Sequence, residues 1–290
     1  MSLNNNRATV FVHYDRDNIV DDYVYFYLQE LQKYSSFLVF VSTTKLKEQD
    51  IENLSQYCSR VIVRENIGYD FMSYKIGLES FVYQDYDEVV ICNDSIYGPV
   101  YPLKNIFNTM QHKECDFWGI TDNNDIDYHL QSYFLVFKKE ILNNQVFSDF
   151  WDNVEALSDK NDIIKKYEVG LTRTLIKAKF TFTIYSSFKP TIIQKILTFS
   201  KKLIPHKIIK KIIALTQRKD DIKRIGKFNT THYFWKELLI SQKMPFVKIE
   251  LLRDNPMNIN INDVKEVIQQ VSDYDTTLID NHLARIKNNK

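Results

Sequence analysis

The sequence has little glycine, little cysteine and no long apolar run. Six glycines in 290 residues argue against collagen-like folds and glycine-rich phosphate loops. Three cysteines, at no metal-ligand spacing, favour free core thiols in a reducing compartment. Because no segment approaches roughly 18 continuous apolar residues and the first six residues carry no signal-peptide pattern, we expect a cytoplasmic protein without a membrane span. The net charge of +1 gives no reason to expect nucleic acid as a partner.

Alternating apolar and amphipathic stretches indicate the fold class. The content of 44% hydrophobic and 26% charged residues is that of a folded globular chain with a sizeable core. Strands are expected at residues 8–15, 37–42, 60–66, 87–95, 115–121 and 132–137. Helices are expected at residues 21–34, 50–57, 72–81 and 102–111. This alternation predicts an α/β fold: a doubly wound, mostly parallel sheet with helices on both faces.

Polar clusters follow three of the expected strands. In a doubly wound sheet the carboxyl ends of the strands form one ligand-binding edge, so the clusters should meet there. We expect them to bind a ligand, and in the second cluster we expect glycine to let the backbone approach that ligand closely. The alternative for Asp70 is a simple helix cap. The residues concerned are His13, Tyr14, Asn66, Gly68, Asp70, Asn93 and Ser95.

The stretch "ICNDSIYGP" (91–99) has the most chemical content. A buried strand delivers Asp94 to the sheet edge between an amide and a hydroxyl side chain. Such oxygen ligands suit a hard divalent cation, Mg²⁺ or Mn²⁺, with substrate phosphates completing the coordination. The alternative is that Asn93 and Asp94 only stabilise a turn through their side chains.

Six ordered motifs carry a family resemblance. "RENIGYDFMSYKIGL", "NDSIYGPVYPL", "DFWGITDN", "HLQSYFLVF", "YEVGLTRTL" and "PFVKIELLRDNP" occur in this order. In order and wording they resemble the rhamnan synthesis protein F family of bacterial glycosyltransferases, from about residue 10 to 256 with an interruption near 189–227. The resemblance implies a GT-A-like fold, a nucleotide-sugar donor and transfer to a growing polysaccharide or lipopolysaccharide. It puts "NDS" at the place of a metal-binding Asp-X-Asp motif, with Asn93 where the first Asp usually stands.

The resemblance also implies roles for residues after the metal-site strand. An inverting transfer needs a general base for the acceptor hydroxyl. Glu168 is the first choice, with Asp116 second; the alternative for Glu168 is a carboxylate favoured by a helix start. Trp118 is expected to stack on a sugar, or else to belong to the core. His129, Gln131 and Ser132 are expected to bind acceptor or donor hydroxyls, although His129 could equally be an ordinary satisfied polar residue.

A basic segment interrupts the resemblance. Residues 189–219 carry nine lysines and arginines and no acidic residue, on an isoleucine-rich amphipathic pattern that Pro205 divides. This pattern suits docking on an anionic membrane surface; the alternative is two helices packed on the protein with a solvated basic face. We therefore expect three parts: a catalytic domain (1–188), a basic helical insertion (189–227) and a helical segment completing the domain (228–290).

Two functions remain open from the sequence. The first is a rhamnosyltransferase, using dTDP-rhamnose and a lipid-linked glycan acceptor at the inner face of the cell membrane. The second is a non-catalytic carbohydrate-binding or assembly subunit that keeps the fold and has lost metal binding, a reading that the Asn93 departure favours.

Overall fold

A seven-stranded mixed sheet forms the centre of the protein. The computed structural model describes residues 6–124, 126–189 and 229–288. The sheet order is β10-β6-β9-β4-β1-β2-β3, and only β9 runs antiparallel to its neighbours. These strands are β1 (Arg7–His13), β2 (Phe37–Ser42), β3 (Arg60–Val63), β4 (Glu88–Asn93), β6 (Phe117–Gly119), β9 (Phe134–Lys138) and β10 (Phe182–Ile184).

Two small two-stranded sheets lie outside the main sheet. One pairs β7 (Asp122–Asn123) with β8 (His129–Leu130), and the other pairs β5 (Ile96–Tyr97) with β11 (Val247–Lys248), each antiparallel.

Helices connect the strands and make up the C-terminal part. Those before residue 185 are α1 (Asp22–Gln32), α2 (Glu48–Leu54), α3 (Tyr69–Glu79), η1 (Tyr83–Asp85), α4 (Leu103–Met110), α5 (Lys139–Leu142), α6 (Gln145–Asp152), α7 (Lys160–Ile163), the π turn η2 (Ile164–Glu168) and α8 (Val169–Lys177). Those after residue 228 are α12 (Thr230–Tyr233), α13 (Trp235–Ser241), α14 (Ile249–Arg253), α15 (Val264–Val271) and α16 (Thr277–Asn288).

Both faces of the sheet are buried, each by its own group of helices. Along β1, Phe11 points into a cluster with α1, α4, α13 and α15, whereas Val10 and Val12 point into a second cluster with α3, α6 and α8. This alternation follows from the two-residue period of a strand. Helix α3 approaches β1 so closely that a Cβ on Gly77 would lie 2.3 Å from Val10 Cγ1. The expected fold class, a mostly parallel sheet with helices on both faces and a helical C-terminal part, is confirmed.

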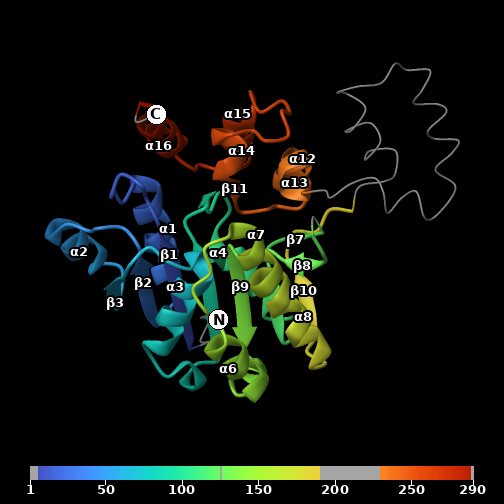
Figure 1. The fold of residues 1–290 in the computed structure, drawn as a ribbon. Helices are drawn as coiled ribbons and strands as arrows, with labels where there is room; N and C mark the ends of the chain where they lie inside the picture. Colours follow the sequence, from blue (N-terminus) through green and yellow to red (C-terminus); the bar gives the residue numbers. More distant parts are fainter. Residues whose placement is uncertain (1–5, 125, 190–228, 289–290) are drawn as a thin grey trace, which may run out of the picture.

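The C-terminal helices lie over the end of the sheet at which β1 and β4 finish (Figure 1). Strand β11 binds β5 in this region, and α16 packs on α1. Residues 190–228, which include all of the basic segment 189–219 except Lys189, lie outside the described residues. The expected amphipathic helices and membrane contact of that segment therefore stay predictions, as does the division into three parts. Within the described ranges, no helix has the length and apolar character needed to cross a membrane.

Candidate functional site

A cavity of about 710 Å³ lies at the carboxyl edge of the sheet. Strands β1 and β4 end there, and the antiparallel β9 begins there, which brings the residues before β9 to the same edge. The structure therefore brings together most of the residues expected from the sequence. Those that line the cavity are His13, Tyr14, Asp70, Asn93, Asp94, Ser95, His129, Gln131, Ser132 and Glu168.

Four expected site residues do not line this cavity, and the structure corrects their roles. Asn66 is exposed. Gly68 has φ 74°, and a Cβ there would lie 2.9 Å from the Ala156 Cα, so this glycine makes room for a neighbouring loop. Trp118 is fully buried in the core. Asp116 precedes β6, which runs parallel to β4, so it lies at the opposite edge of the sheet and binds Thr181.

Asn93 uses both ends of its amide within the protein. Its Nδ2 donates to Asp70 Oδ2 at 2.9 Å. Its Oδ1 accepts from the Ser95 backbone N–H at 3.2 Å and from Ser95 Oγ at 2.7 Å. An aspartate at position 93 would lose the donor and turn a carboxylate toward Asp70. The departure from Asp-X-Asp is thus part of a specific hydrogen-bond arrangement.

Asp94 lies beside the end of β1. Its Oδ2 accepts from the Tyr14 backbone N–H at 2.9 Å and lies 4.0 Å from His13 Nε2. Burial lowers the pKa of His13 to about 4, and its Nδ1 contacts Ser42 Oγ at 3.0 Å. His13 is therefore neutral at pH 7, and its contact with Asp94 is not an ion pair.

Asp70 and Asp94 are half-buried carboxylates that line the same cavity, and within the described part of the chain neither has a lysine or arginine within ion-pair distance. Burial raises the pKa of Asp94 well above its usual range, and the charge of Asp70 raises it further. Burial also raises the pKa of Asp70, although the hydrogen bond from Asn93 acts in the opposite direction. Two carboxylates that line one cavity offer the hard oxygen ligands that a divalent cation of the Mg²⁺ or Mn²⁺ type prefers, since such an ion typically takes one or two carboxylates. The residues present therefore fit such an ion, with Asp70 and Asp94 as its protein ligands. Asn93 is not among them, because both ends of its amide already bind within the protein.

Glu168 lines the same cavity. It is the last residue of η2, inside a continuous helical stretch from α7 to α8, so it is not at a helix start. Its Oε1 accepts from the Ser132 backbone N–H at 2.7 Å and from Ser132 Oγ at 2.8 Å. A single π turn inside a helix is found frequently at functional sites, and here the π turn itself carries Glu168, at its last position.

His129 approaches the second oxygen of the same carboxylate. Its Nδ1 lies 2.8 Å from the Asp127 carbonyl oxygen, and because a carbonyl only accepts, this nitrogen carries the proton. Its Nε2 then lies 3.7 Å from Glu168 Oε2. With the proton on Nδ1, the lone pair of Nε2 faces the carboxylate oxygen that Ser132 does not bind.

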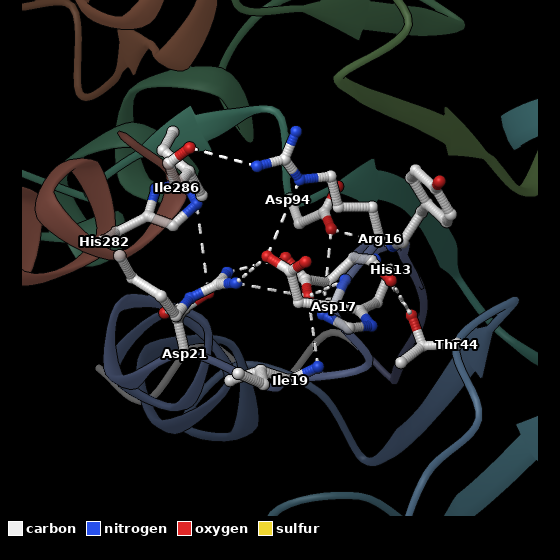
Figure 2. A network of polar contacts seen from close by, with 12 residues as sticks. His13, Arg16, Asp17, Ile19, Asp21, Thr44, Asp94, His282 and Ile286 are labelled. Atoms are coloured by element: carbon white, nitrogen blue, oxygen red, sulfur yellow. Dashed lines mark hydrogen bonds and ion pairs between the residues drawn. The ribbon is translucent and has the colours of Figure 1, made fainter. Parts of the chain in front are cut away.

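A second polar network closes the side of the cavity under α16 (Figure 2). Arg285 binds Asp15 (Nη2 to Oδ2, 2.6 Å), Asp17 (Nη1 to Oδ2, 2.9 Å) and Asp21 (Nε to Oδ1, 3.0 Å). Asp15, Asp21 and His282 offer ligand atoms within 4.8 Å of one another. However, the Arg285 guanidinium binds both of these carboxylates. We therefore assign this cluster to the attachment of α16 to the β1–α1 loop, and not to a metal.

The sequence interpretation missed the cationic side chains that line the cavity, which are Arg16, Lys160, Lys248 and Arg253. Of these, Lys248 on β11 is the half-buried one and the other three are exposed. Lys248 belongs to the motif "PFVKIELLRDNP", where apolar neighbours mark a buried strand. A lysine in such a run was the available signal.

The model of the family described as "Rhamnan synthesis protein F" matches residues 38–219, more than half of the chain. The chain belongs to the rhamnan synthesis protein F family. This family member is also 30% identical, over 266 residues, to "Virulence protein VirA" of Vibrio anguillarum, with 87% of this chain and 81% of that protein covered.

Two solved structures are more distant. The glycosyltransferase GlyE of Streptococcus pneumoniae has a TM-score of 0.37 and 13% identity, with 72% of this chain and 52% of GlyE covered. The 4-diphosphocytidyl-2C-methyl-D-erythritol synthase of Anaerococcus prevotii has a TM-score of 0.39 and 12% identity, with coverages of 74% and 97%. At these scores neither likeness bears on the activity of this family member.

Proposed function

We propose that this protein is a glycosyltransferase that uses a nucleotide-sugar donor. The observation that carries the proposal is the meeting of three carboxylates, Asp70, Asp94 and Glu168, in one cavity of a rhamnan synthesis protein F family member. Group transfer from a diphosphate needs a cationic environment for the leaving group and a base for the attacking hydroxyl. We assign the first function to Asp70 and Asp94, through a bound cation, and the second to Glu168.

Asp94 and Asp70 would hold the divalent cation, and such an ion supplies charge neutralisation for the donor diphosphate. The nucleoside and sugar would then lie along the end of β1, where His13 and Tyr14 line the cavity. Ser95 stays bound to Asn93 and would act on the donor only by fixing that amide.

Glu168 is the proposed general base. As the acceptor oxygen attacks the anomeric carbon, its proton passes to Glu168, and the bond to the diphosphate breaks. Ser132 fixes the carboxylate through Oε1, which leaves Oε2 to accept the proton. The neighbouring His129 stabilises that proton, since its Nε2 points at Oε2. A single attack of this kind inverts the anomeric centre.

Rhamnose is the proposed sugar, because the family's description names rhamnan synthesis. We propose dTDP-rhamnose as the donor and a lipid-linked glycan as the acceptor. The basic segment within residues 189–219, with nine positive and no negative side chains, supports docking at the inner face of an anionic membrane. Gln131 binds Thr121 and lines the cavity as a candidate acceptor contact.

Donor hydrolysis in solution tests the proposal. The wild-type protein, incubated with dTDP- and UDP-sugars and Mn²⁺, should release nucleoside diphosphate slowly, and Asp94→Asn should lower the rate about 100-fold or more, as loss of an essential cation ligand does. Glu168→Gln should abolish transfer to an acceptor while binding nucleoside diphosphate as tightly as the wild type. A wild-type protein that binds nucleotides but releases none, with or without metal, would instead support the non-catalytic carbohydrate-binding subunit.

A further inference from the structure

Strand β11 attaches a lysine directly beside the "NDS" segment. Lys248 pairs with Ile96 in the β5–β11 ladder. The next residue, Ile249, donates its backbone N–H to the Ser95 carbonyl at 3.0 Å. The three residues 95–97 that follow β4 and Asp94 are thus bound to the C-terminal segment, and this fixes Lys248 at the wall of the cavity.

The ammonium group of Lys248 is not committed to a carboxylate. Its Nζ lies 3.9 Å from the centre of the Tyr133 ring, and in the described ranges no carboxylate oxygen lies within ion-pair distance of it. Glu168, Glu250 and Asp70 act on its charge from farther away, and burial is the stronger effect, lowering the pKa of Lys248 to about 8. An aromatic face stabilises a cation without using its three N–H donors. Those donors remain for another partner.

Other cationic side chains at the cavity are engaged or exposed. Arg16 donates to the Ile286 carbonyl and pairs with Asp17. Arg253 binds Asp254. Lys160 is exposed to solvent. Among the described cations of the cavity, Lys248 is therefore the half-buried one whose N–H donors no carboxylate of the described residues takes up.

We propose that Lys248 binds the diphosphate of the donor and neutralises the leaving group. The inference rests on the proposed function and names the residue that recognises the phosphates. When the bond between the anomeric carbon and the diphosphate oxygen breaks, its electron pair stays on that oxygen and adds negative charge. The acceptor oxygen forms the new bond, and its proton goes to Glu168. Lys248 meets the added charge on the diphosphate and forms no covalent bond.

Binding of nucleoside diphosphates compared with nucleosides tests this role. Calorimetric titrations with dTDP and UDP, in EDTA and again in Mn²⁺, should show that Lys248→Met weakens the diphosphate about 10- to 100-fold, more in EDTA than in Mn²⁺. Thymidine and uridine, followed by ligand-observed NMR, should bind Lys248→Met as they bind the wild type. Lys248→Arg keeps the charge and should restore part of the diphosphate affinity.

Lys265→Met is the matched control, because Lys265 forms an exposed ion pair with Asp280 away from the cavity. It should leave all these affinities unchanged. If Lys248→Met fails to fold, Lys248→Gln replaces it, since the amide keeps length and polarity without charge.

The outcomes separate the two proposals. Wild-type protein that binds none of these nucleotides, with or without Mn²⁺, overturns the proposed function and the role of Lys248 with it. Unchanged diphosphate affinity in Lys248→Met overturns the role of Lys248 alone. Equal losses for nucleoside and diphosphate also overturn it, because they show that the lysine only shapes the cavity around Asp70 and Glu168.

Discussion

Restoring the usual acidic residue at position 93 should damage this protein. Asn93→Asp removes the hydrogen bond to Asp70, worth about 1 kcal/mol, and places a third carboxylate beside Asp70 and Asp94. Two unit charges about 4 Å apart repel by about 4 kcal/mol at an effective dielectric constant near 20. Alternatively, Asp70 and the new aspartate can share one proton, which removes the repulsion. Keeping a carboxyl group with a pKa near 4 protonated at pH 7 costs about 1.4 kcal/mol for each of the three pH units, which is again about 4 kcal/mol. The bonds from Ser95 survive, so we expect the free energy of unfolding to fall by about 3–5 kcal/mol at pH 7.

The pH dependence identifies the cause. The folded-state pKa of the added carboxyl is raised, so the folded protein binds its proton more tightly than the unfolded chain does. The deficit is therefore small near pH 4 and grows as the pH rises to 7. Urea unfolding of wild type and Asn93→Asp at several pH values measures it. Asn93→Ala is the control: it loses the hydrogen bonds of Asn93 without adding charge, so its deficit of about 1–3 kcal/mol should change little with pH.

A charge-swapped double variant completes the test. Asp70→Asn combined with Asn93→Asp rebuilds the hydrogen bond with donor and acceptor exchanged, so it should recover most of the lost stability. Addition of Mn²⁺ should also stabilise Asn93→Asp more than the wild type, because the third carboxylate is a further ligand. The reasoning is refuted if Asn93→Asp equals the wild type at pH 7, or if its deficit matches that of Asn93→Ala at every pH.

Three further predictions concern other parts of the molecule. Affinity for dTDP or UDP should fall as the pH rises above about 8, since Lys248, which faces Glu168, Glu250, Asp70 and Lys160, must be charged to bind phosphate; Lys248→Met should lack this fall in calorimetric titrations. Glu88→Ala should lower the free energy of unfolding by about 3–5 kcal/mol in urea, because it leaves the fully buried Arg7 without its partner, whereas the double change to Arg7→Met and Glu88→Leu should cost far less. Replacing four lysines of the basic segment with Gln should abolish salt-sensitive sedimentation with anionic vesicles and leave donor hydrolysis in solution unchanged; these are Lys201, Lys202, Lys210 and Lys211. Unchanged sedimentation would contradict membrane docking.

Local patterns predicted the sheet because each strand carries its own signal. The run before Asn93 is apolar and stops at polar residues, which is enough to assign a buried strand and the edge at which it ends. The same argument brought His13 and Asp70 to the cavity. The predicted placement of Gly68 and Asp116 in the site was wrong, for reasons that cannot be read from the sequence alone. The left-handed glycine serves a contact with Ala156, and only the strand order shows that Asp116 stands at the far edge.

The apolar run around Lys248 indicates a buried lysine, but it does not show that this lysine reaches the cavity. Its strand is two residues long and gains a partner only through pairing with β5, so only the three-dimensional structure places Lys248 in the site. Glu168 was selected through the family resemblance. Its contacts with Ser132 and His129 depend on the antiparallel direction of β9, which brings the residues before β9 to the carboxyl edge of the sheet. The sequence thus indicated which side chains lie at the carboxyl edge of the sheet. The pairing of distant segments determines which of these side chains contact one another in the cavity.

The pairing of β11 with β5 also bears on how the site comes into being. It joins residues roughly 150 positions apart in the chain, whereas each strand of the main sheet is already present once residue 184 has been made. Distant contacts close later than local ones, because the entropy of the intervening chain must be overcome first. A newly made chain can therefore complete its sheet while the wall with Lys248 is still missing. Acquiring the fold and acquiring the ligand site are then separate events, and the second depends on a strand only two residues long.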